Sequence, residues 1–523
     1  MTTRKPATSK KQPAPKAKHI AVRSFAAAQT DRLLSGWRFD GGFSANEIKG
    51  QLATIRSRSR EMAKNNPHFK RWLQLVATNI VGGDGFSLKS TPHDGFPGRP
   101  DYRPDDMAAR FIEYHWWRFC NFRDPDTGAT WCDSAGRKTS TEMDLLNVKT
   151  WARDGEFIML PQVADNPYGI TFRIIRPDAL AEALNRDGGN GENPIFCGVE
   201  KDRNTGRHVA YYFYTLDPQA EIRTSGGNLV RIPASKVIHG FTPDDEDQTR
   251  GIPWAHAVLV KLKMLDEYDK AEITAARDEA CSVRTYFASA TDPDGILDLT
   301  TDEGSDYAGA LVAEKEAGQS EILPPGWDSK VNVPSHPNRE LTAFKVSMLR
   351  DVASGLGVEY ANFANDWAGV SFSSVRQGTI SERDGWVMLQ NQYIAQAKTP
   401  MFLAWLKSFL SLSISGDFPA EKFPKFSEHE FRGRRWMWVD PMKDMNAAKM
   451  AVENGWKTNT DVAADLGTDF ADNLETIKRE QATRKSLGLP EIQPIAPPQA
   501  PPAKPEDDDE EDGETVAKKE PAK

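Results

Sequence analysis

The chain contains few cysteines, and none of them stands at a spacing that builds a covalent or metal site. Its 523 residues include four cysteines, Cys120, Cys132, Cys197 and Cys281, and no CxxC pair. Disulfide-stapled domains are dense in cysteine, and structural zinc sites group their ligands at short spacings. The sequence therefore excludes a disulfide framework and a zinc site, and it predicts reduced thiols in a cytosolic protein.

Long apolar runs are also missing. A membrane-spanning helix needs about 18 or more mostly apolar residues, and candidates such as residues 401–414 are interrupted by Lys407 and several serines. The basic N-terminus is not followed by the apolar stretch of a secretory signal. We therefore expect a soluble protein with no membrane partner.

The common catalytic motifs are absent as well. The sequence has no GxxxxGK[ST] phosphate loop, no HExxH, no GxSxG and no Cys/His cluster, and its nine histidines are scattered. Each of these motifs places a nucleophile, base or metal ligand where its chemistry needs it. We therefore predict no catalytic, cofactor-binding or metal-binding residues, which disfavours a nucleotide-driven motor or a common hydrolase.

A basic excess is lacking too, because the formal net charge is −9. Residues 1–24 carry seven Lys or Arg and no acid, and residues 506–523 carry nine acids and three Lys, which leaves −10 on the chain between them. An acidic body disfavours binding that neutralises DNA phosphates, but it is compatible with a conduit through which DNA slides. The basic arm at 1–24 and the Pro-rich, acidic tail at 490–523 are predicted to be disordered.

The dominant positive feature is a long helical pattern at residues 254–287. Pro253 suits a first helical position, and apolar residues recur every three or four positions. The predicted helix would be roughly 50 Å long. Its apolar face includes Leu265, and its second half carries small residues that allow close helix packing, namely Ala271, Ala275, Ala276 and Ala280. Two hypotheses fit: a core helix of an α+β enzyme, or a helix that packs against copies of itself in a ring.

The rest of the chain predicts an α+β fold. Residues 25–253 begin with helices and change at Glu156 to short runs rich in β-branched and aromatic residues, which predict a mostly antiparallel β domain. The later part begins with a compact insert rich in Pro and Gly at 288–336, a second helix at 337–357 and a loop at 358–372. A long helix with its following segment at 373–440 and a helical end at 441–489 complete it. Pro400 is expected to break or kink the long helix.

Several short stretches, in chain order, carry a family resemblance. They are RSRSREMAKNNP, NIVGGDGF, GVEKDRNTGRHVAYYFY, RIPASKVIHGF, QTRGIPWAHAVL, LPPGWDSKV, HPNRELTAF, LRDVASGLGVEYANFANDWAGVSFSSVRQG and WVDPMKD. Together they resemble the lambda-type portal proteins of tailed bacteriophages over roughly residues 30–490. The chain departs from the family pattern in local loops, for example in the four acids at residues 244–247 and in Glu359 after GLGV.

The resemblance implies a ring, typically of twelve subunits, at one vertex of a capsid. Double-stranded DNA would enter and leave through its channel. The implied partners are other copies of the chain, the terminase large subunit, head-completion and neck proteins, and the major capsid or scaffold protein. The implied location is the virion, with the host cytoplasm during assembly. The resemblance also implies that the protein is not an enzyme.

Specific segments acquire roles from the same resemblance. The wing corresponds to residues 25–253 with 373–440, and the two stem helices correspond to 254–287 and 337–357. The inserted clip is 288–336, the tunnel loop is 358–372 and the helical crown is 441–489. The residues expected to face DNA in the tunnel loop are Asn362, Asn365, Trp367 and Ser371. The residues expected to pack stem helices are Leu265 and the four alanines named above.

An acidic channel wall is a further expectation, with Asp266, Glu267, Asp269 and Glu272 as its candidates. One alternative stays open. The chain could be a soluble enzyme or a monomeric DNA-binding protein, built on the β domain and the segment that mixes Trp with Arg432, Arg434 and Arg435.

Overall fold

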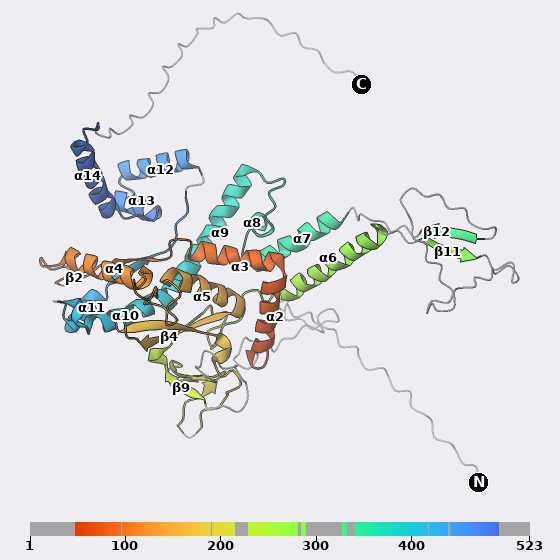
Figure 1. Ribbon diagram of the computed structural model, residues 1–523, viewed down its shortest axis with the longest axis horizontal. Helices are drawn as coiled ribbons and strands as arrows, with labels where there is room; N and C mark the ends of the chain where they lie inside the picture. Colours follow the sequence, from red (N-terminus) through yellow and green to blue (C-terminus); the bar gives the residue numbers. More distant parts are fainter. Residues whose placement is uncertain are drawn as a thin grey trace, which may run out of the picture. The chain divides into compact units, whose positions relative to one another are not determined.

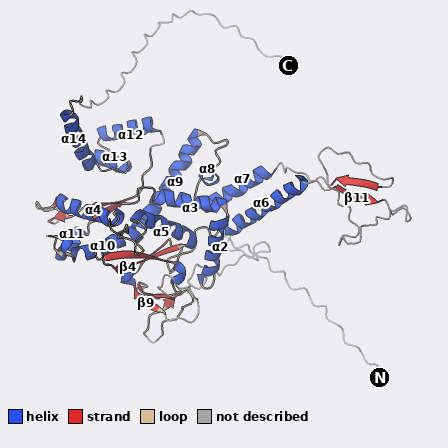
Figure 2. Ribbon diagram, viewed as in Figure 1, coloured by secondary structure: helices blue, strands red, loops and turns tan. Residues whose placement is uncertain are grey.

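The computed structural model forms two compact units, Met1–Arg434 and Arg435–Lys523, and each is described by itself. The described residues are 48–95, 97–189, 191–214, 229–280, 284–288, 327–331, 340–416, 418–437 and 440–490. The predicted basic arm, nearly all of the predicted acidic tail and most of the predicted insert at 288–336 lie outside these ranges. Figure 2 shows that helices make up most of the described chain and that the strands are short.

The first described helices follow their sequence signals. Helix α2 spans Leu52–Asn65 and α3 spans Pro67–Ile80. Asn66 separates them, and its Oδ1 accepts a hydrogen bond from the Phe69 backbone N–H at 2.9 Å, so it caps α3 directly before a proline at the first helical position. One face of α3 is buried, as its apolar spacing predicts: Phe69, Trp72, Leu73, Val76, Ala77 and Ile80.

Two further helices precede the sheets. Helix α4 spans Asp106–Asn121, and α5 spans Ser140–Asp154. Thr139 and Glu142 form a reciprocal capping box at the start of α5, and Gly155 ends it in a left-handed conformation with φ of 91°. A Cβ on Gly155 would lie 2.3 Å from the Ile252 carbonyl carbon, so this position requires glycine for both its conformation and its close contact.

The predicted antiparallel β domain is confirmed as two small sheets. The first has the order β10-β4-β5, from Ile238–Phe241, Glu156–Val163 and Ile170–Ile175. The second has the order β6-β7-β8-β9, from Ile195–Phe196, Val199–Lys201, His208–Phe213 and Val230–Pro233. Apolar side chains of both sheets share a buried cluster that includes Ile158, Ile175, Val199 and Phe213. Helix α5 packs against β4 (Figure 1).

Short strands complete the β structure of the first unit. They pair antiparallel as β1 with β13 and as β2 with β3, which span Ser87–Ser90, His429–Arg432, His93–Asp94 and Arg103–Pro104.

The predicted helix at 254–287 is shorter at both ends, where α6 spans Leu259–Ala280. Residues 254–258 form turns instead, because the Trp254 backbone N–H donates to the Ala152 carbonyl of α5 at 3.1 Å and the Trp254 ring packs against Trp151. Residues 284–287, predicted as helix, belong to strand β11, Arg284–Ala288, which pairs antiparallel with β12, Trp327–Val331. Thr285, Tyr286 and Phe287 favour a strand once a pairing partner exists.

The second predicted stem helix is α7, Leu341–Gly355, so it ends two residues before the predicted boundary. The predicted long helix is α9, Phe372–Tyr393, and it continues through a π-helical turn, η4, Ile394–Lys398, into α10, Thr399–Leu410. Pro400 therefore does not end the run of helical residues. It lies in the first turn of α10, directly after the wider π-helical turn, where proline's lack of a backbone N–H is tolerated.

A short helix precedes β13 near the end of the first unit, and the second unit is helical, as predicted. Helix α11 spans Phe423–Phe426. In the second unit, α12, α13 and α14 span Pro441–Glu453, Asn459–Asp465 and Phe470–Ser486. Their N-termini are capped by the side chains of Asp440, Thr458 and Asp469. The fold class is α+β, as the sequence predicts.

Candidate functional site

Helices α6 and α7 form an antiparallel pair, and they lie side by side in Figure 1. Lys345 Nζ of α7 lies 2.6 Å from Asp269 Oδ2 of α6, and Lys261 Nζ of α6 lies 2.9 Å from Asp351 Oδ2 of α7. Next to the Lys345–Asp269 pair, the rings of Tyr268 and Phe344 meet edge to face at 5.3 Å. The two helices therefore form one paired unit through electrostatic and aromatic contacts.

Gly355 allows the end of α7 to approach the start of α6 closely. A Cβ at Gly355 would lie 2.5 Å from Cγ1 of Val258. Val258, Leu262, Leu349, Val352 and Ala353 are all buried. The two glycines of the GLG sequence at residues 355–357 thus have different reasons. Gly355 allows close helix packing, and Gly357 adopts a left-handed φ of 68°.

The five residues predicted to pack stem helices do not share one environment. Leu265 is buried, with 5% of its surface exposed. Ala271 is exposed and Ala275 half-buried, and both share a helical face with Val260 and Met264. Ala276 is exposed and lies seven residues after Asp269, on the face turned towards α7. The side chain of Ala280 lies outside the described part of the structure.

The four acids proposed for a channel wall all have partners in their own chain. Asp269 pairs with Lys345, and Asp266 Oδ2 lies 2.8 Å from Lys270 Nζ. Glu267 lies 3.9 Å from Lys263, and Glu272 accepts a hydrogen bond from the Tyr268 hydroxyl at 2.6 Å. Asp266, Glu267 and Asp269 are therefore paired with lysines of the same chain, whereas Glu272 keeps its negative charge.

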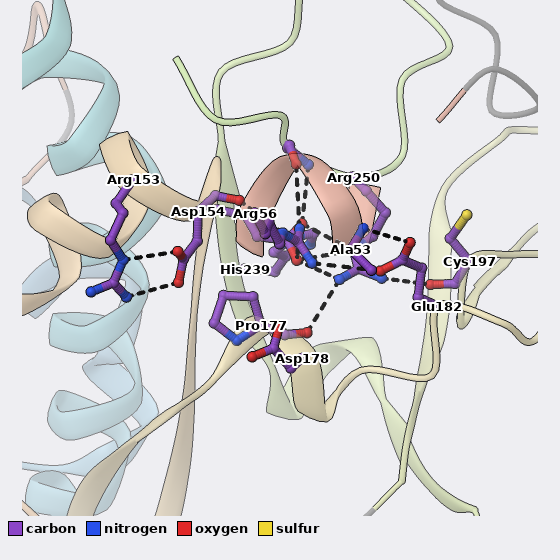
Figure 3. Close-up of polar contacts among 12 residues, drawn as sticks. Ala53, Arg56, Arg153, Asp154, Pro177, Asp178, Glu182, Cys197, His239 and Arg250 are labelled. Carbon is purple, nitrogen blue, oxygen red and sulfur yellow. Dashed lines mark hydrogen bonds and ion pairs between the residues drawn. The ribbon is translucent and has the colours of Figure 1, made fainter. Parts of the chain in front are cut away.

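A buried ion network lies where the chain enters α6 (Figure 3). Its centre is Glu156 of β4, which is fully buried. The Glu156 carboxylate lies 2.5 Å from Arg250 Nη2 and 2.8 Å from Arg56 Nη2. It also accepts the Gly251 backbone N–H at 3.0 Å and faces His239 Nε2 at 3.1 Å. One carboxylate thus joins α2, β4, β10 and the segment before α6.

Two guanidinium groups hold this carboxylate in its charged form. Burial alone would raise the pKa of Glu156, but the charges of Arg250 and then Arg56 outweigh it and hold the pKa well below the usual 4.5. Arg250 Nη1 also donates to the Cys197 carbonyl at 2.8 Å, and Arg56 Nε donates to the Asp154 carbonyl at 2.9 Å. The network is therefore hydrogen-bonded to the backbone as well as charge-paired.

A second carboxylate extends the network. Asp154 Oδ1 and Oδ2 each lie 2.9 Å from Arg60, through Nε and Nη2, and Arg153 reaches the same carboxylate at 2.9 and 2.8 Å. Arg60 Nη1 continues to Asp178 at 2.5 Å. Both family-like stretches RSRSRE and QTRG therefore supply arginines to one buried framework. Sequence reasoning missed it, although Arg56 and Arg60 visibly share a helical face.

Close backbone contact accompanies these charges. A Cβ on Gly251 would lie 2.0 Å from the Gly155 carbonyl oxygen. The two glycines let the end of α5 and the segment before α6 touch, which brings Arg250 to Glu156.

The predicted tunnel loop at 358–372 is not one open loop, because α8, Tyr360–Ala364, lies inside it. Asn362 Nδ2 donates to Glu382 Oε2 of α9 at 2.6 Å, and Ser371 caps α9 by accepting the Ser374 backbone N–H. Asn365 ends α8 in a left-handed conformation with φ of 55°, and Trp367 is 50% exposed. Two of the four predicted residues thus have structural contacts, while Asn365 and Trp367 stand at the exposed turn.

The arginine segment proposed for DNA binding in the alternative hypothesis is largely built into the fold. Arg434 Nη1 donates to the Thr78 carbonyl, and the Arg434 carbonyl accepts from Gln390 Nε2 at 3.1 Å. Arg432 lies in β13 opposite Ser87 of β1. Arg435 begins the second unit and is exposed. The segment therefore does not present its arginines as one patch.

The described ranges contain no grouping of three or more His, Cys, Asp or Glu side chains able to hold a metal ion. None of their helices has the length and apolar character that crossing a membrane requires. Cys120, Cys132 and Cys197 are free and buried, and burial raises the pKa of the Cys120 thiol to about 12.

The chain is similar to proteins of known tailed phages. It is 31% identical over 477 residues to the "Probable portal protein" of Halomonas phage phiHAP-1, a match that covers 90% of this chain and 88% of that one. It is 23% identical over 463 residues to portal protein B of Escherichia phage lambda, covering 83% and 84% of the two chains. Among solved structures it matches a chain from the neck of a native GTA particle computed with C12 symmetry, with a TM-score of 0.43, 13% identity and coverage of 80% and 94%.

The family match spans the features described above. The model of the lambda-family phage portal proteins matches residues 30–390, which contain the buried ion network, the α6–α7 pair and the segment around α8. The match and the relative at 31% identity agree on one assignment. This chain belongs to the lambda family of phage portal proteins.

Proposed function

We propose that the protein forms the ring-shaped channel at one capsid vertex through which double-stranded DNA is packaged and ejected. The observation that supports this proposal is the antiparallel α6–α7 pair. Its outer face is exposed in the single chain, and the chain belongs to a portal family. Twelve copies close the ring, the number that the family resemblance implies. In such a ring each subunit contacts its two neighbours through two different faces, and repeating the same rotation from one subunit to the next closes the ring.

The outer face of α6 is the contact that we assign to a neighbouring copy. Val260 is 58% exposed, Met264 lies four positions later and is 64% exposed, and Ala271 continues the same face seven positions after Met264. Large exposed apolar side chains in a row mark an interaction surface more often than isolated ones do. The small Ala271 and Ala275 would let the neighbouring stem approach closely.

The remaining parts of the proposal concern partners and chemistry. The protein is a structural component with no catalysis of its own, located in the virion after assembly in the host cytoplasm. The ring docks the terminase large subunit, then head-completion and neck proteins, and it meets the major capsid or scaffold protein. Three of the acids of α6 are paired with lysines and Glu272 keeps its negative charge, so this helix offers no excess of positive charge to DNA phosphates, which favours sliding over adhesion.

Met264→Asp is expected to abolish ring formation and leave the single chain folded. The side chain is mostly exposed in one chain, so the substitution costs little there. In the ring it would bury an unpaired carboxylate at every contact, at a cost of several kcal/mol. Each cost of about 1.4 kcal/mol lowers an association constant tenfold. Sedimentation velocity would show a single-chain species and thermal unfolding would be unchanged.

Met264→Leu is the matched control, because it keeps the apolar volume and should form rings like the original chain. Rings of normal abundance from Met264→Asp would remove the outer face of α6 from the subunit contact.

A further inference from the structure

We infer that Glu382 is a positioning residue that clasps α8 to α9 and thereby sets where the exposed turn at Trp367 projects. This inference rests on the proposed function, together with the tunnel loop that the family resemblance implies around Trp367. The first observation is the use of both carboxylate oxygens. Glu382 Oε2 accepts from Asn362 Nδ2 at 2.6 Å and from the Glu359 backbone N–H at 3.4 Å, and Oε1 accepts from Trp386 Nε1 at 3.1 Å.

The donors come from both sides of the contact. Glu359 and Asn362 belong to the start of α8, whereas Trp386 lies one turn after Glu382 on the same face of α9. Trp386 is only 4% exposed, so its indole is fixed by packing. A fixed indole N–H orients the Glu382 carboxylate towards α8, and charge-assisted bonds of this kind are stronger than neutral ones.

Packing keeps α8 at this distance. A Cβ on Gly378, one turn before Glu382, would lie 2.8 Å from the Glu359 carboxyl carbon, so the Glu359 side chain lies directly against α9 at this glycine. Phe363 of α8 is 1% exposed and its ring lies 5.6 Å from the His68 ring. The first half of the segment, residues 359–364, is thus held on two sides.

The exposed turn follows α8 through a second link. Asp366 accepts hydrogen bonds from the Tyr360 hydroxyl at 2.8 Å and from the Ala368 backbone N–H at 3.0 Å. These two bonds fix the turn that carries Trp367 to α8 itself. The Arg350 guanidinium of α7 lies 5.4 Å from the centre of the Tyr360 ring. Glu382 therefore positions Trp367 indirectly, and α7 reaches the same element from the opposite side.

The test measures local opening of α8 in the full chain by amide hydrogen exchange. Glu382→Ala should speed exchange of the α8 amides about tenfold or more, the ratio expected for losing charge-assisted bonds, while amides of α10 keep their rates. Chymotrypsin cleavage after Trp367, relative to cleavage after the exposed Trp117, should rise in parallel. Asp384→Ala, which removes an exposed carboxylate of α9, should change neither quantity.

A second variant separates the clasp from a general loss of structure. Asn362→Ala removes the donor on α8 and leaves Glu382 in place, so it should loosen α8 as Glu382→Ala does, and the double variant should add little. Unchanged α8 exchange in Glu382→Ala, or fully additive effects, would overturn the inference. Both readouts work on the chain whether or not rings form, so a failed clasp and a failed ring are separate results.

Discussion

Replacing Glu156 by glutamine is expected to lower the free energy of unfolding by about 3–5 kcal/mol, because two buried guanidinium groups lose their shared counter-charge. Arg250 and Arg56 are each 1% exposed, so water cannot replace the carboxylate. Urea unfolding followed by tryptophan fluorescence would measure the change, since Trp151 and Trp254 lie at the end of α5 and at the start of the segment before α6. The network also anchors the segment that leads into α6, so the start of the α6–α7 pair should be held less firmly in the same variant.

Glu421→Gln is the control for this substitution. Glu421 is exposed in a short turn before α11, so its change should stay within about 0.5 kcal/mol. An effect of Glu156→Gln as small as that of the control would contradict the role of the network.

The same carboxylate predicts a direction for the pH dependence. The pKa of Glu156 in the folded chain lies well below its ordinary value of 4.5, so the unfolded chain takes up the proton first as the pH falls. The stability that Glu156 contributes is complete above about pH 4.5 and is lost below it. The difference in unfolding free energy between the original chain and Glu156→Gln should therefore shrink as the pH drops below that value.

Asp144→Asn is expected to cost a similar amount, about 3–5 kcal/mol, by stranding a buried lysine. Lys398, the last residue of the π-turn, lies 2.9 Å from Asp144 and 2.8 Å from the Ser140 hydroxyl, and both ionic side chains are 2% exposed. Burial lowers the pKa of Lys398, but the Asp144 carboxylate outweighs it and keeps the pKa above its usual value. In Asp144→Asn this counter-charge is gone and burial lowers the pKa of Lys398, so the variant must either hold an unpaired buried ammonium or give up its proton, and both cost stability.

A double variant makes this prediction sharp. Lys398 is surrounded by the rings of Phe86, Trp116 and Phe431, at about 6 Å from each centre. Adding Lys398→Met to Asp144→Asn replaces the stranded charge by an apolar chain among those rings, so the double variant should be more stable than Asp144→Asn alone. Lys407→Met, at an exposed position of α10, should change little. A double variant less stable than Asp144→Asn would contradict the charge explanation.

Local signals predicted the elements that depend on local chemistry. The β-rich runs after Glu156 were readable, because alternation acts within a few residues, and the cap at Asn66 and the glycine end at Gly155 are equally local. The ends of α6 were not readable. Helix α6 begins later than predicted because the Trp254 backbone N–H bonds to the Ala152 carbonyl. It ends earlier than predicted because residues beyond it form a strand that pairs with a strand beginning at Trp327.

The buried network was hidden for a similar reason. Arg250 lies 94 residues after Glu156, and Arg56 reaches a carbonyl 98 residues away, so no spacing rule joins them. Lys398, at the end of the π-turn, likewise pairs with the distant Asp144 on α5, a contact that no local signal indicates. In the tunnel-loop segment, the polar residues Asn362 and Ser371 suggested contacts with DNA, whereas their side chains bond to α9.

The most direct test of the portal assignment is the mass and shape of the purified full chain, by native mass spectrometry with negative-stain microscopy. We predict rings with a central hole and about twelve times the chain mass of 58.3 kDa. A species of one chain mass, both alone and in the presence of the scaffold and capsid proteins of the same phage, would contradict the proposal.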